Sequence, residues 1–216
     1  TLLLASRAPS ASWVRGVLGR FAQEDQAGLA LHLGMAREYV EAASAAAAQE
    51  GPIFYVDNHM RPYTGQQTVR KGWRMQDKRV RPGASDYYIH DEDGRAVGRF
   101  SAPHHGALTD FLTPTALLLR LALPEENILL AFDRAGAFPV QLSELRDEGF
   151  EFVTYERRPY ALLAESAFTE SIIRDGEKLL LHEQEKRNLG GGRGRVRRIC
   201  VRTEDGRQIN LLAVSK

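Results

Sequence analysis

The sequence predicts an α/β fold in which helices flank a mixed β-sheet. Two short apolar runs of strand-favouring residues, 53–56 and 128–132, each lead directly into an aspartate. An Asp-Gly turn at residues 93–94 joins two further strand-like runs. Between this hairpin and the second apolar run, aliphatic residues recur at helical spacing. Strands and helices in this order are typical of a mixed sheet covered by helices.

The composition is that of a folded protein with a sizeable core. The chain has 216 residues, 43% of them hydrophobic, and a formal charge of +1 from 29 basic and 28 acidic residues. A near-neutral total still allows local basic patches. The single cysteine, Cys200, excludes an internal disulfide and fits a reducing compartment. No apolar run approaches the roughly 18 residues of a membrane span. We therefore expect a cytoplasmic protein without a membrane partner.

Residues 1–50 are predicted to form an N-terminal helical segment. A helix from Trp13 to Phe21 follows residues 9–12, which include serines suited to cap it. A second, Ala-rich helix runs from Gly28 to about Gln49. Both are expected to pack against the rest of the protein. The chain begins with Thr rather than Met, which suggests that it was excised from a longer protein.

Residues 51–165 are predicted to form the core domain. The first apolar strand ends at Asp57, and a polar, basic segment follows that we expect to be an extended loop or short strands. The hairpin should pair beside the Asp57 strand. Pro114 suits the first turn of the next helix, and Gly149 suits the end of the one after it. The expected elements after the basic segment are strands 86–90 and 95–100, helix 109–123, strand 128–132, helix 138–147 and strand 150–155.

Residues 166–216 are predicted to be rich in β-structure. Three strand-like runs cover 177–183, 197–202 and 208–214. An Asp-Gly turn joins the last two, and a glycine-rich basic loop separates the first two.

Asp57 and Asp133 are the candidate catalytic residues. Each follows an apolar strand, and this topology allows both to reach the same edge of one sheet. Two carboxylates about 4 Å apart repel by roughly 4 kcal/mol at an effective dielectric constant near 20, so a proton or metal ion would have to neutralise them. Oxygen ligands favour Mg²⁺ or Mn²⁺ over zinc, and two such ions could activate a water or a 3′-hydroxyl. Alternatively, each aspartate only caps a turn.

Several motifs resemble those of bacterial insertion-sequence DDE transposases. Residues 55–65, 71–73 and 82–88 resemble the start of that catalytic core, in which Asp-Gly-His is common where this chain has Asp57-Asn58-His59. Residues 132–136 and 149–155 are similar to the family's second-aspartate strand and the helix-strand unit that follows. The resemblance, over roughly residues 50–216, implies a ribonuclease-H-like fold in which Asp57 and Asp133 hold Mg²⁺ or Mn²⁺.

The activity that this resemblance implies is metal-dependent DNA cleavage and strand transfer. A ribonuclease-H-like nuclease without transfer activity is one alternative. Another is a transposase-derived protein that binds DNA but is catalytically inactive. DNA is the expected partner, and a homodimer in the transposition complex is a further expectation.

The resemblance also implies a third carboxylate, a Glu on a helix after a β-rich insertion. Residues 166–216 match the insertion, so we expect this Glu beyond Lys216, and we expect the chain by itself to be an inactive, truncated core. Glu151, Glu156, Glu165 and Glu170 are internal candidates, of which Glu156 is the least improbable.

Two basic clusters are candidate DNA-binding segments, with aromatic residues suited to stack on a base. Solvated surface is the alternative for each cluster. His59 could contact a phosphate or a metal-bound water, or simply bond to backbone, and His104-His105 is expected to be a solvated turn. The candidate DNA-binding residues are Arg61, Lys71, Trp73, Arg74, Lys78, Arg79, Arg193, Arg195, Arg197 and Arg198.

Overall fold

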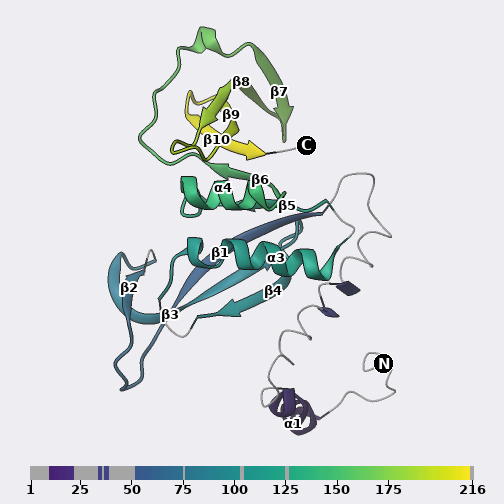
Figure 1. Ribbon diagram of the computed structural model, residues 1–216. Coiled ribbons are helices and arrows are strands. Elements are labelled where there is room, and N and C mark those ends of the chain that lie inside the picture. The colour runs from purple at the N-terminus through teal and green to yellow at the C-terminus, as the bar shows by residue number, and fades with distance from the viewer. Residues whose placement is uncertain are drawn as a thin grey trace.

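A single mixed sheet of ten strands organises the described part of the chain, residues 10–21, 34–35, 37–38, 52–74, 76–102, 105–124 and 127–214 of a computed structural model (Figure 1). The strand order is β2-β3-β1-β5-β6-β10-β9-β8-β7, and β4 pairs with β3 outside this path. Among these strands, only the pairs β1–β5 and β5–β6 are parallel. The strands are β1 (Ile53–Pro62), β2 (Lys71–Arg74), β3 (Arg79–His90), β4 (Ala96–Ser101), β5 (Leu129–Phe132), β6 (Glu151–Tyr155), β7 (Glu170–Arg174), β8 (Glu177–Asn188), β9 (Arg195–Arg202) and β10 (Gln208–Val214).

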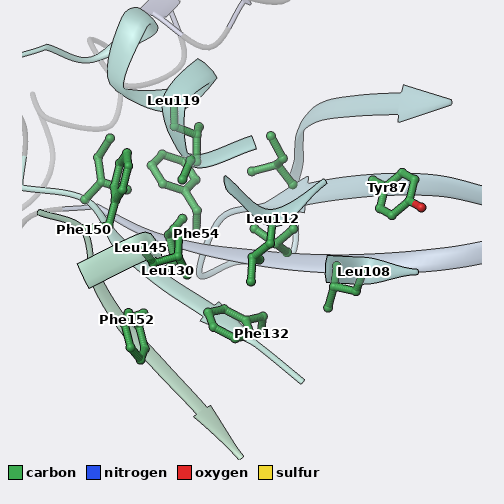
Figure 2. Packing of buried hydrophobic residues seen from close by; sticks show 14 of the residues in the cluster. Phe54, Tyr87, Leu108, Leu112, Leu119, Leu130, Phe132, Leu145, Phe150 and Phe152 are labelled. Atoms are coloured by element: carbon green, nitrogen blue, oxygen red, sulfur yellow. The ribbon is translucent and has the colours of Figure 1, made fainter. Parts of the chain in front are cut away.

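Two crossover helices cover one face of the central strands (Figure 1). Helix α3 (Leu112–Ala122) leads from β4 to β5, and α4 (Pro139–Asp147) leads from β5 to β6. Figure 2 shows Leu119 and Leu145 of these helices with Phe54 and Leu130 in the buried core. Burying side chains of this size stabilises the fold by about 1.5–3 kcal/mol each. The predicted helices 109–123 and 138–147 and the predicted α/β class with a mixed sheet are confirmed.

Helix α1 (Ala11–Phe21) forms as predicted, but Trp13 and Val14 on it are exposed. The Ser10 hydroxyl accepts a hydrogen bond from the Trp13 amide at 3.2 Å, as expected of a cap. Trp13 is nevertheless 47% exposed and Val14 is 37% exposed. Residues 34, 35, 37 and 38 are helical, and the rest of the predicted helix 28–49 lies outside the described residues.

Strand β1 is longer than the apolar run that predicts it. Its antiparallel pairing with β3 extends to Pro62 opposite Gly83, so Asp57 lies within the strand rather than after it. The predicted hairpin strand 86–90 is likewise the last part of the longer β3, which pairs with β1 and β4 as expected. The strand-to-strand hydrogen bonds continue through polar residues because the backbone, not side-chain hydrophobicity, makes them.

The C-terminal strands continue the core sheet. Strand β10 pairs antiparallel with β6, from Leu211 opposite Tyr155 to Val214 opposite Phe152. Strands β9 and β8 follow, and β7, a strand that the sequence did not predict, pairs with β8. Two 3₁₀ turns complete the described elements, η2 (Leu108–Asp110) and η3 (Glu165–Ala167).

A buried carboxylate ties β3 to its two neighbours. Asp86 on β3 accepts hydrogen bonds from Ser101 Oγ at 2.7 Å and Arg99 Nη2 at 3.0 Å on β4, and pairs with Arg61 Nε of β1 at 3.3 Å. Burial by itself would raise the pKa of Asp86. The hydrogen bonds and the nearby arginines outweigh burial and hold this pKa below its usual value.

We predict that Asp86→Asn lowers the free energy of unfolding at pH 7 by about 1–3 kcal/mol, because two arginines lose their buried acceptor. Since the folded-state pKa is lowered, the stabilisation is present above the unfolded pKa near 3.8 and is lost as the pH falls through the folded pKa. Urea unfolding at pH 7 and pH 3.5 measures this difference, which should shrink at the lower pH.

Asp93→Asn, at an exposed ion pair with Arg95, is the matched control and should change little. An equal loss at both pH values for Asp86→Asn would contradict this account.

Candidate metal centre and nucleic-acid interface

The two candidate metal-binding aspartates lie on neighbouring central strands. Strands β1 and β5 are parallel, and their register ends with Val56 beside Phe132. Asp57 is the next residue of β1, Asp133 is the first residue after β5, and both are exposed. Because side chains alternate along a strand and Val56 points into the core, Asp57 points to the face that α3 and α4 do not cover. The register therefore brings the predicted pair to the same edge.

Each aspartate uses one carboxylate oxygen in a local hydrogen bond. Asp57 Oδ1 accepts from the Asn58 amide at 2.8 Å, and Asp133 Oδ1 accepts from the Ala135 amide at 2.6 Å. The Asp133 contact is the turn-capping bond that the alternative interpretation expects. Among the described residues, the two Oδ2 atoms have no hydrogen-bond partner. A second oxygen of each carboxylate therefore remains available for a ligand.

His59 lies on the same side of β1 as Asp57, two residues further along the strand. Its Nδ1 is 3.3 Å from Nε2 of Gln76, which lies in the turn between β2 and β3. The contact joins the β2–β3 turn to the strand that carries Asp57.

Glu156, the foremost internal candidate for the third carboxylate, is already neutralised. It follows β6 and its side chain is 3% exposed. Arg187 and Arg198 donate to it, Arg198 at 2.7 Å, and Asn210 donates at 2.8 Å. Such an acid has no free oxygen for a metal without breaking a buried ion cluster.

The other glutamate candidates lie away from the two aspartates along the chain. Glu151 begins β6, at the end opposite to the one that lies beside Asp133. Glu165 in η3 pairs with Arg202 at 3.6 Å, and Glu170 begins the exposed strand β7. Within the described ranges, no three His, Cys, Asp or Glu residues are grouped so that they could hold a metal ion.

The first basic cluster forms a two-stranded ribbon, residues 70–82, made of β2, the β2–β3 turn and the start of β3. It has six basic residues and one acidic residue, Asp77, which binds Arg81 at 3.0 Å and Arg74 at 3.5 Å. Trp73 lies opposite Val80, and both are more than half exposed. Lys71, Lys78 and Arg79 are exposed as well. Arg61, outside this ribbon, is 56% exposed and pairs with Asp86.

The second basic cluster is divided by the fold. Arg193 in the loop before β9 and Arg195, the first residue of β9, are exposed. Arg197 pairs with Glu183 at 2.8 Å, and Arg198 joins the buried Glu156 cluster. Side chains alternate along β9, so Arg198 shares the side of the buried Val196 and Arg197 does not. The four arginines therefore do not form one patch.

A cavity of about 470 Å³ adjoins Asp133 between the end of β6 and the start of β10. Sequence reasoning missed the three arginines that line it. Arg134, Arg158 and Arg207 come from separate loops, and the β6–β10 pairing brings two of them together. No local sequence pattern predicts that arginines from separate loops line one cavity. The remaining lining residues are Tyr155, Glu156, Tyr160, Ile209 and Asn210.

His105 has a structural role, while His104 lies outside the described residues. The Nδ1 atom of His105 is 3.3 Å from the hydroxyl of the buried Ser85. Its ring also packs against Gly72, where a Cβ atom would be only 2.3 Å from it. His105 thus connects the loop after β4 to β2.

Within the part of the chain that is described, no helix has the length and apolar character needed to cross a membrane.

Glu156→Gln should destabilise the protein by about 3–5 kcal/mol, because it leaves Arg187 and Arg198 partly buried without their counter-charge. Glu183→Gln removes one carboxylate from an exposed pair with Arg197 and should cost at most about 1 kcal/mol. Chemical denaturation of both variants at pH 7 gives the comparison. Similar losses for the two variants would show that the Glu156 cluster is not a special support of the fold.

The comparisons with known proteins do not assign a family. No protein-family model matches the sequence. No curated protein matches it either. Among solved structures, the chain is similar to piggyBac transposase in a synaptic complex with hairpin DNA, with a TM-score of 0.42 and 11% sequence identity. The alignment covers 76% of this chain but 33% of that transposase. A similarity this distant carries no argument about this chain.

Proposed function

We propose that this chain is the catalytic core of a metal-dependent DNA transposase, with a ribonuclease-H-like sheet and Asp57 and Asp133 as metal ligands. The observation that carries this proposal is the parallel register of β1 and β5, which gives the two aspartates adjacent positions. The motifs around Asp57 and Asp133, read from the sequence, support the same assignment. The order of the elements from β1 to β6, a hairpin followed by two parallel crossover units, agrees with the expected mixed sheet.

The chemistry of the donor set fits Mg²⁺ or Mn²⁺. Both aspartates offer a carboxylate oxygen that makes no hydrogen bond within the described residues. Bound ions of this kind supply a nucleophile at neutral pH and stabilise the charge that develops on a phosphodiester. The protein's own contribution is to hold the two carboxylates on rigid, paired strands. His59 lies beside Gln76 at Nδ1, and we propose that its other ring nitrogen contacts a phosphate oxygen.

The basic ribbon is the proposed contact for duplex DNA outside the metal centre. Asp77 is its only acidic residue, so most of its cations remain free to bind phosphates. Its contact with His59 keeps the ribbon next to the strand of Asp57. Trp73 and Val80 add an exposed apolar pair between the cations. We propose that DNA held by the ribbon reaches the aspartates along β1.

A second candidate function is DNA binding without catalysis. It is favoured by the engagement of Glu156 in a buried ion cluster and by the missing three-ligand group among the described residues. Both candidates share the ribbon as the DNA contact, and they differ in whether Asp57 and Asp133 bind metal.

Asp57→Asn and Asp133→Asn should each weaken Mn²⁺ binding by at least about tenfold, since each removes a charged ligand. Calorimetric titration of the purified chain with Mn²⁺ measures this effect. Asp93→Asn, an exposed aspartate in the β3–β4 turn, is the control and should leave binding unchanged. If native protein binds no Mn²⁺, or binds it independently of both aspartates, the catalytic proposal fails and the non-catalytic candidate remains.

The double variant Lys78→Gln/Arg79→Gln should bind duplex DNA more weakly and with a smaller salt dependence. Loss of two phosphate contacts lowers the slope of log affinity against log salt by about 1.8. Fluorescence anisotropy between 50 and 200 mM salt provides that slope. Arg174→Gln/Lys178→Gln removes the same charge from the distant β7–β8 hairpin and serves as the control. An unchanged slope in the ribbon variant, or an equal decrease in both variants, would count against ribbon contact.

A further inference from the structure

The cavity beside Asp133 has the construction of a binding site. One wall is the segment after β6, and the opposite wall is the start of β10. Gln208 joins these walls, because its side chain accepts from the Leu163 amide at 2.8 Å and donates to the Ala161 carbonyl at 3.3 Å. Its backbone carbonyl accepts from the Tyr160 hydroxyl at 3.3 Å. A volume of about 470 Å³ lies within the range of roughly 300–1,000 Å³ that is usual for small-ligand pockets.

The charge of the cavity is positive. Arg134, Arg158 and Arg207 are exposed around it and form no ion pair with a carboxylate of the described residues, although Arg207 interacts electrostatically with Asp205 outside the cavity lining. Glu156 also lines it, but two other arginines already neutralise this acid. Asp133 is the remaining carboxylate. Three guanidinium groups against one carboxylate favour an anionic ligand, and guanidinium matches phosphate in geometry.

Aromatic rings make up much of the remaining lining. Tyr155 is the last residue of β6 and pairs with Leu211 of β10, yet it is 49% exposed. Tyr160 is held by its bond to β10, and the Arg158 guanidinium lies 5.7 Å from the centre of its ring. Flat apolar surfaces beside cations suit a ligand that combines a phosphate with a sugar or a base.

We propose that this pocket binds one nucleotide of the DNA strand, next to the phosphodiester held at Asp57 and Asp133. The phosphate contacts Arg134, Arg158 and Arg207, and the nucleoside lies against Tyr155 and Tyr160. The inference rests on the proposed function for the identity of the strand. It does not depend on metal, because none of these five side chains is a proposed metal ligand.

Thymidine 3′,5′-bisphosphate serves as the probe, because it presents one nucleotide with both flanking phosphates. Calorimetry is performed on the full chain in EDTA, so that metal binding cannot contribute. Arg158→Gln/Arg207→Gln should weaken binding at least about tenfold, since it removes two charge-assisted contacts. The β7–β8 control Arg174→Gln/Lys178→Gln should bind as the native chain does. Thermal unfolding of each variant confirms that the fold is retained.

Two further variants separate this pocket from the metal centre. Asp133→Asn removes a like charge beside the phosphate and should tighten probe binding about threefold. Asp93→Asn, at the exposed ion pair with Arg95, is the control and should leave probe binding unchanged. No detectable probe binding, or binding that the two arginine changes do not affect, overturns the pocket assignment even if Mn²⁺ binding is intact. Conversely, probe binding that depends on these arginines upholds the pocket even if Mn²⁺ does not bind.

Discussion

The parallel pairing of β1 with β5 is the constraint on which the candidate site depends. It fixes Val56 beside Phe132 and therefore Asp57 and Asp133 as the next positions. The alternation of side chains then sends apolar groups toward α3 and α4 and leaves Asp57 on the other face. The core pins the register, because a slip of one residue would bury the aspartate and expose valine. The packing of apolar side chains on one face of the sheet thus positions the candidate metal ligand Asp57 on the other face.

A second constraint is the buried ion cluster around Glu156. It links the end of β6 with Arg187 of β8, Arg198 of β9 and Asn210 of β10. The cluster makes the C-terminal strands an extension of the core sheet and shapes one side of the cavity beside Asp133. It also removes Arg198 from the predicted DNA-binding group. One buried acid thereby accounts for the attachment of these strands and for the division of a basic cluster.

Local patterns predicted much of the fold. The apolar runs before Asp57 and Asp133, the Asp-Gly hairpin and the glycine after α4 all indicated elements that the structure contains. Gly149 has a φ of +76°, which explains why glycine ends that helix. The extent of β1 was missed, and the segment of the ribbon was predicted only as an extended loop or short strands, because these residues are polar and basic. Backbone pairing with a partner strand, rather than hydrophobicity, makes them strands.

The sequence by itself determined the class of fold, the two aspartates at the ends of apolar runs and the basic composition of the ribbon, because these are properties of neighbouring residues. Tertiary structure alone decided that Asp57 and Asp133 occupy adjacent register positions. It also decided that Glu156 is neutralised by arginines from other strands, and that Arg134, Arg158 and Arg207 surround one cavity. These outcomes depend on which strands pair and in what register. Contacts between segments far apart in the chain fix that choice, so no local pattern encodes it.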